Sequence, residues 1–184
     1  MKKLGYIFVQ LLAITLVACG GGTDKGEEPV NEQTYKVSEE SKAGEYSMQI
    51  STAQGNEVID GAEFHYEIKR TPSKDLSLVK DEQGNKFVDN IISLKILKNG
   101  KQILDKRFTK KDFSGLVGAE FLSNSILEGL VFDQVVKGHL RFAASVCYPQ
   151  TDLYVPFCVT VSKDGSLRLE KGSVLDEEIP GGAE

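Results

Sequence analysis

Hydrophobic and polar residues alternate along several stretches of the chain. In one example Phe64, Tyr66 and Ile68 alternate with His65 and Glu67. The other stretches with this rhythm are residues 46–50, 140–146 and 153–161. A period of two places alternate side chains on opposite faces of a β-strand, so each stretch predicts a strand with one buried face. We therefore expect a mainly β fold, either an antiparallel β-sandwich or an open barrel.

Glycine-containing turn signals separate these stretches, among them Asp60-Gly61 and Asn99-Gly100. At Asn99-Gly100 a two-residue turn pairs Ile96 with Ile103. It also places Leu97 and Leu104 together on the other face, which leaves open whether both faces of the sheet are covered there.

The last turn of the domain is more tightly constrained. Keeping Val161 and Leu167 on one face excludes a two-residue loop at Asp164-Gly165. A three-residue loop, Lys163–Gly165, pairs Val161 with Leu167 and places Gly165 in the left-handed conformation. We expect the three-residue loop.

One stretch departs from the period of two. Val117, Phe121, Leu122 and Ile126 recur at helical spacing. We expect a short helix at about 116–128, weakened by Gly118 and packed across one end or one face of the sheet.

Parity also suggests how the two longest C-terminal strands pair. A register that places Val146 opposite Val159 keeps both on the core face and places Cys147 opposite Cys158 on the other face. The connecting segment is then 148–157. Two interpretations remain open: a disulfide between Cys147 and Cys158, or two separate thiols.

The N-terminus has the parts of an export signal. Met-Lys-Lys is followed by an apolar run from Leu4 to Ala18, too short to serve well as a permanent spanning helix. The run ends in Leu16-Val17-Ala18-Cys19, which resembles the lipobox of bacterial lipoproteins at all four positions. The resemblance implies that residues 1–18 are removed and that Cys19 carries a diacylglycerol lipid, which would hold the domain on a membrane.

The remaining segments differ in composition. Residues 19–33 form the lipidated cysteine and a polar, glycine-rich linker, residues 34–172 a single β-rich domain, and residues 173–184 an acidic tail. Acidic residues soon after Cys19, among them Asp24, are similar to the surface-export signals of Bacteroidetes lipoproteins. The domain would then lie in the cell envelope on the outer membrane, with periplasmic and surface-exposed placement both open.

Charge narrows the range of partners. Removing Lys2 and Lys3 with the leader changes the formal net charge from −5 to −7. No basic cluster interrupts this negative surface, so we do not expect a nucleic acid partner or electrostatic binding to a membrane surface. The contact with a membrane is expected through the lipid alone.

Few residues suggest chemistry. His65 and His139 lie at polar positions of predicted strands and lack the spacing of a metal site, and the sequence contains no catalytic or cofactor motif. We therefore nominate no catalytic residue, metal ligand or cofactor. Tyr148 and Tyr154 flank the loop at Pro149 and could form a small recognition patch, although such tyrosines more often close the end of a hairpin.

The overall layout is similar to that of Bacteroidetes lipoproteins that carry a domain of unknown function. Along the domain the likeness rests on residues 108–113 and on the hairpin at Pro149. Such a family implies a cell-envelope location and no defined activity. Three functional classes stay open: a non-enzymatic module that binds an envelope protein or polymer, a lipocalin-like carrier of a small apolar ligand, and a hydrolase whose site the sequence does not reveal. We favour the first.

Overall fold

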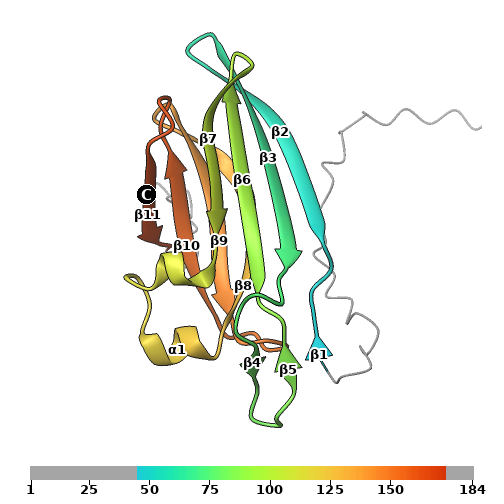
Figure 1. The fold of residues 1–184 in the computed structure, drawn as a ribbon. Coiled ribbons are helices and arrows are strands. Elements are labelled where there is room, and N and C mark those ends of the chain that lie inside the picture. The colour runs from blue at the N-terminus through green and yellow to red at the C-terminus, as the bar shows by residue number, and fades with distance from the viewer. Residues whose placement is uncertain (1–44, 173–184) are drawn as a thin grey trace, which may run out of the picture. The chain divides into compact units, whose positions relative to one another are not determined.

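The computed structural model describes residues 45–172, which consist mainly of β-strands (Figure 1). The elements in chain order are β1 (Glu45–Tyr46), β2 (Ser51–Ile59), β3 (Ala62–Pro72), β4 (Val79–Lys80), β5 (Lys86–Phe87), β6 (Asn90–Lys98), β7 (Lys101–Phe108), the 3₁₀ helix η1 (Lys110–Phe113), α1 (Ala119–Ser123), β8 (Ile126–Val136), β9 (His139–Cys147), β10 (Tyr154–Val161) and β11 (Leu167–Lys171). The mainly β prediction is confirmed.

The strands form two large antiparallel sheets and one small sheet. The first large sheet has the order β2-β3-β6-β7 and is called the β2 sheet below. The second has the order β11-β10-β9-β8 and is called the β8 sheet. In the small sheet, of order β1-β5-β4, β1 runs parallel to β5. No strand joins the two large sheets within the described part of the chain, so the fold is an open sandwich rather than a closed barrel.

The two large sheets pack their inner faces against an aromatic-rich core. The Phe113 and Phe157 rings stack with centroids 4.5 Å apart, and the Tyr66 and Phe132 rings with centroids 4.9 Å apart. The alternation predicted in residues 64–68 and 140–146 is confirmed, because the core-facing members of both runs are buried. Burial of these inner faces is the main apolar contribution to folding.

Two residues that the alternation assigns to a buried face are exposed instead. Ile50 is 62% exposed because it lies in the connection between β1 and β2, and Leu153 is 58% exposed because it precedes the first residue of β10. The prediction of a strand over 46–50 is therefore wrong except at Tyr46, which belongs to β1, because residues 47–50 form a connection. The strand predicted over 153–161 begins one residue before the observed β10.

The tight turns gather at one end of the sandwich (Figure 1), called the turn end below. Asp60 and Gly61 both have positive φ, as do Asn99 and Gly100, which is the conformation of a two-residue type I′ turn. The turn-end contacts include the side-chain pair Lys163–Asp60, which connects the two large sheets.

The three-residue loop Lys163–Gly165 is confirmed. Val161 lies opposite Leu167, and Gly165 has a φ of 90°. The pairing around Asn99-Gly100 differs in one detail. The turn has two residues, but a bulge next to Ile96 places Leu104 rather than Ile103 opposite it.

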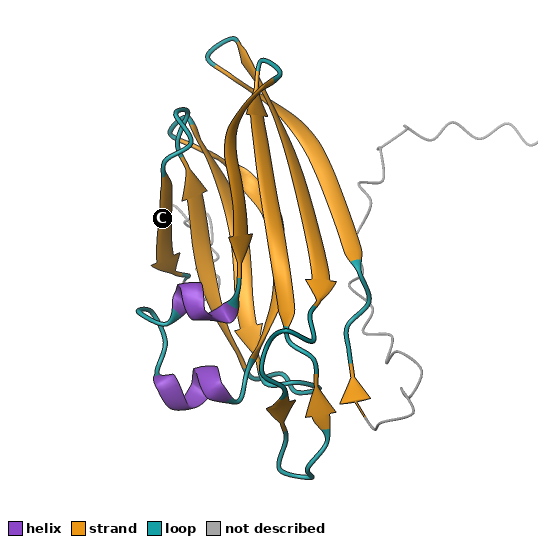
Figure 2. Cartoon of the chain, viewed as in Figure 1, coloured by secondary structure: helices purple, strands orange, loops and turns teal. Residues whose placement is uncertain are grey.

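The predicted helix is too long. Figure 2 shows two short helical segments at the end of the sandwich opposite the turns, and the second of them, α1, covers only Ala119–Ser123. Gly118 has an extended backbone and caps α1. The apolar residues at helical spacing in the sequence extend to Ile126. In the structure Ile126 and Leu130 are indeed buried, but as members of strand β8.

The predicted register of β9 and β10 is wrong by four residues. Val146 lies opposite Val155, Cys147 lies opposite Tyr154, and Cys158 lies opposite Ala143. The connecting loop is therefore residues 148–153, closed by a 2.9 Å hydrogen bond from the Tyr148 amide to the Leu153 carbonyl.

Candidate functional site

The register places Cys147 and Cys158 apart. Both lie on the outer face of the β8 sheet, but a four-residue offset separates them by about 13 Å along the strands. A disulfide needs α-carbons less than about 7 Å apart. The two cysteines are accordingly separate thiols, and the interpretation as a disulfide is not supported.

Tyr148 and Tyr154 do not form one patch. The Tyr148 ring stacks on Phe121 of α1, with centroids 4.5 Å apart. Tyr154 lies opposite Cys147 and therefore projects from the outer face, where it is 50% exposed. The structure thus divides the predicted patch into a tyrosine that packs on α1 and an exposed tyrosine beside Leu153.

Several predictions concern residues outside 45–172. Cys19, the leader 1–18, the linker 19–33 and the tail 173–184 lie outside the described residues. The predicted boundary of the domain at residue 34 also falls there.

The sequence analysis did not identify a cluster of buried polar side chains at the end opposite the turns, which is called the clamp. It consists of side chains that hold the beginning of β8. Its members are Arg70, Asp89, Asn90, Lys110, Glu128, Ser145 and Cys147.

Asp89 is the centre of the clamp and is only 2% exposed. Its Oδ1 atom accepts hydrogen bonds of 2.8 Å from the backbone amides of both Asn90 and Leu127. Its Oδ2 atom lies 3.4 Å from Nζ of Lys110, which also donates to the Ser125 carbonyl at 2.6 Å. A buried carboxylate needs such partners, because an uncompensated buried charge is strongly unfavourable.

Asn90 and Arg70 extend the clamp to the next residues of β8. Nδ2 of Asn90 donates to the Leu127 carbonyl at 2.9 Å, and a guanidinium nitrogen of Arg70 donates to the Glu128 carbonyl at 2.8 Å. Burial lowers the pKa of Arg70, and the neighbouring Cys147 acts in the opposite direction. Arg70 Nε and Asn90 Oδ1 are buried without a hydrogen-bond partner in the structure of residues 45–172.

Backbone groups at the start of β8 thus receive partners from side chains distant in sequence. The strand has a bulge between Leu127 and Gly129, where the regular ladder with β9 is interrupted. Buried backbone N–H and C=O groups need hydrogen bonds. The clamp therefore supplies hydrogen-bond partners where the bulge interrupts the pairing of β8 with β9. This arrangement gives the clamp a structural role.

The thiol of Cys147 lies in the same region and is buried with Val79, Phe87 and Ile126. Burial raises its pKa far above the usual value, and the charge of Glu128 and a hydrogen bond with that carboxylate act in the same direction. A thiol held in its protonated form is a poor nucleophile and a poor metal ligand. The geometry therefore gives Cys147 a packing role.

The remaining candidates lie on the surface or lack the grouping that chemistry needs. His65 Nδ1 lies 2.9 Å from Oδ1 of Asn56, and His139 is on a different strand. Within residues 45–172 no three histidine, cysteine or acidic side chains group as they would around a metal ion. Neither helical segment described there has the length and apolar character of a membrane span.

No curated protein matches the chain. Residues 31–169, well over half of the chain, match a family described as a domain of unknown function, DUF4738. This range includes the β2 sheet, the clamp and all of the β8 sheet except the last two residues of β11. The chain therefore belongs to the DUF4738 family.

Proposed function

We propose that this protein is a lipid-anchored module of the cell envelope that binds a partner without catalysing a reaction. The observation that carries the anchor is the sequence Leu16-Val17-Ala18-Cys19 directly after a basic start and an apolar run. Two or more acyl chains on Cys19 would hold the domain on a membrane, because each buried methylene contributes about 0.8 kcal/mol.

Binding is favoured over catalysis by the way the buried polar groups are used. The side chains of Asp89, Asn90 and Lys110 are engaged with backbone groups of residues 125–127. A carrier is less well supported, because stacked rings such as Phe113 and Phe157 occupy the space between the sheets. Lipocalin-like carriers need an apolar cavity there.

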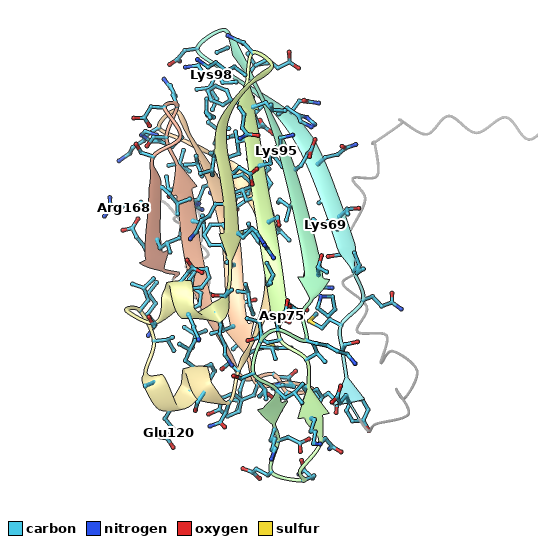
Figure 3. The ribbon with its side chains drawn as sticks, in the orientation of Figure 1. Lys69, Asp75, Lys95, Lys98, Glu120 and Arg168 are labelled. Carbon is cyan, nitrogen blue, oxygen red and sulfur yellow. The ribbon has the colours of Figure 1, made fainter. Side chains whose placement is uncertain are left out.

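The edge strand β2 is the surface that we propose for the partner. Its nine residues pair with β3 without any register shift, and Glu57 is its single charged residue. By contrast, strands β3 and β6 of the same sheet carry exposed or half-buried lysines such as Lys69 and Lys95 (Figure 3). A long, regular edge with little charge is suited to the addition of another strand.

The other edges of the large sheets are less suitable. β8 has two register shifts, β7 pairs with β6 through a bulge, and β11 is only five residues long. Bulges and short length are common means of preventing strand addition. We therefore propose that the partner offers an extended, largely uncharged polypeptide segment, which would pair with β2 through its backbone.

The orientation of the β2 backbone provides a sharp test. Ile59 and Ala62 flank the type I′ turn and form a hydrogen-bonded pair. The backbone N–H and C=O groups of Ile59, and of every second residue before it, therefore point toward β3. The backbone amides of the alternate residues of β2, including that of Gln54, point away from the sheet. Gln54→Pro removes an outward donor and keeps the pairing with β3, whereas Gln54→Ala keeps the donor.

The experiment uses full-length protein in native envelopes, with a photo-reactive amino acid at Thr52. We expect one envelope protein to be cross-linked in the wild type and in Gln54→Ala, and to be lost in Gln54→Pro. Equal cross-linking in both variants would exclude β2 as the binding edge.

In parallel, Cys19→Ala should abolish incorporation of labelled fatty acid. Unchanged incorporation in that variant would exclude the anchor.

A further inference from the structure

Two large apolar side chains are exposed at opposite ends of the edge strand β2 (Figure 1). Val58 is 74% exposed, and Ile50, which directly precedes the strand, is 62% exposed. Val58 lies opposite the exposed Glu63, on the outer face of the β2 sheet. Ser51 lies opposite the buried Arg70 and therefore on the inner face. Alternation then places Ile50 on the outer face with Val58.

The spacing of these two residues is symmetric. A single exposed apolar residue needs no explanation, but Ile50 and Val58 each lie four positions from Gln54. When two identical strands pair antiparallel about a twofold axis, residues at equal distances on either side of the axis lie opposite one another. An axis at Gln54 therefore places Ile50 of each copy opposite Val58 of the other.

The backbone of β2 is suited to this register. The residues whose N–H and C=O groups point away from β3 include Thr52, Gln54 and Asn56. With the axis at Gln54, this residue lies opposite its own copy and Thr52 lies opposite Asn56, so outward groups meet outward groups. A shift of one residue would bring outward groups against groups that already bond to β3. A shift of two residues restores the hydrogen bonds but separates Ile50 from Val58.

The charge on β2 is also placed favourably. Glu57 is the single charged residue of the strand and lies on the inner face, opposite Phe64 of β3. In the twofold pairing it falls opposite Ser51 of the second copy and not opposite another acid. Like charges directly opposite one another destabilise a sheet, and this register avoids them.

We propose that the partner of β2 is a second copy of this chain, paired antiparallel through β2 about a twofold axis at Gln54. The pairing joins two four-stranded sheets into one continuous sheet and covers Ile50 with Val58 at both ends of the contact. β2 is itself extended and nearly uncharged, as the partner segment must be. The inference rests on the binding proposed at β2 and identifies the partner.

Disulfide trapping between full-length copies tests the register. Cells produce two differently tagged copies together, one with Ile50→Cys and the other with Val58→Cys, and the lipidated protein is mildly oxidised in detergent micelles. The α-carbons of a hydrogen-bonded antiparallel pair lie about 5.5 Å apart, within reach of a disulfide. Two copies of Ile50→Cys would hold these thiols about 27 Å apart along the strands. We expect at least about tenfold more cross-linked dimer from the mixed copies than from either variant alone.

Two further variants test the role of the backbone at the axis. Gln54→Pro in both copies removes the outward donor there and should reduce the disulfide to the level of the single variants. The matched control Gln54→Ala keeps the donor and should leave the disulfide unchanged.

Three results would overturn the proposal. If the mixed copies form no more dimer than the single variants, while the photo-reactive group at Thr52 still captures an envelope protein of another mass, β2 binds a different partner. If neither the disulfide nor a photo-cross-link forms, the binding proposed at β2 fails as well. If Ile50→Cys alone forms as much dimer as the mixed copies, the antiparallel register is wrong.

Discussion

The two ends of the sandwich are held together by different kinds of contact. At the turn end, each hairpin closes within a few residues through backbone conformations with positive φ, as at Asp60-Gly61 and Asn99-Gly100. The contact between the sheets there includes an exposed ion pair, Lys163–Asp60. At the opposite end, the clamp connects buried side chains with backbone groups up to 58 positions away.

The difference shows where the stability of the fold depends on single residues. A type I′ turn depends on the local backbone, and water can solvate its polar groups. The clamp holds polar groups that are removed from water, so each lost partner leaves a buried group unsatisfied. Changes in the clamp should therefore affect both large sheets, whereas changes in most turns should act locally.

The largest effect is expected from Asp89→Ala. The variant removes the oxygen that accepts hydrogen bonds from two backbone amides, and it leaves Lys110, whose side chain is 13% exposed, without its countercharge. Breaking a buried pair by removing one partner costs about 3–5 kcal/mol. We expect a loss of this size in the free energy of unfolding, measured by urea denaturation.

The matched control is Asp133→Ala. Asp133 pairs with Arg141 at 2.6 Å, but both side chains are 36% exposed. Exposed pairs contribute about 0–1 kcal/mol. Similar losses for Asp89→Ala and Asp133→Ala would contradict the assignment of the clamp as the part that holds this end.

The turn end could be predicted from the sequence because its signals are local. The three-residue loop at Lys163–Gly165 follows from the parity of Val161 and Leu167 together with one glycine. The inner face of β9 follows from its alternation. In both cases the information lies within about ten residues of chain.

The opposite end could not be predicted for two physical reasons. A shift of four residues preserves the parity of a strand, so alternation does not distinguish Val146 opposite Val159 from Val146 opposite Val155. The clamp joins Arg70, Asp89 and Lys110 through the fold rather than through any spacing. The nearest signal in the sequence was the pair Asp89-Asn90 directly before an apolar strand.

A smaller effect, and an exception to purely local turns, is expected at Gly165. A β-carbon at Gly165 would collide with the backbone carbonyl of Ile103, and the residue has a φ of 90°. Gly100 has a φ of 77° but open space around it. The left-handed conformation costs about 1–2 kcal/mol for alanine, and overpacking adds about 1–3 kcal/mol. In urea denaturation Gly165→Ala should therefore lose about 2–5 kcal/mol of the free energy of unfolding, and Gly100→Ala should lose clearly less. Equal losses would show that the turn does not pack against β7.

The smallest effect concerns the pH dependence of the clamp end. Because its pKa is raised from the ordinary value of 9.0, the Cys147 thiol keeps its proton in the folded protein, whereas the unfolded chain releases that proton as the pH rises above 9.0. The stability that this group contributes is therefore fully present below pH 9 and is lost as the pH rises, by about 1.4 kcal/mol between pH 8 and pH 10.

Urea denaturation at both pH values should show a smaller alkaline loss of stability for Cys147→Ala than for the wild type. Cys158→Ala leaves Cys147 in place, so its alkaline loss should equal that of the wild type. The same alkaline loss in all three proteins would mean that the thiol of Cys147 is as accessible to water as that of an unfolded chain, and the clamp would then be open at its β9 side.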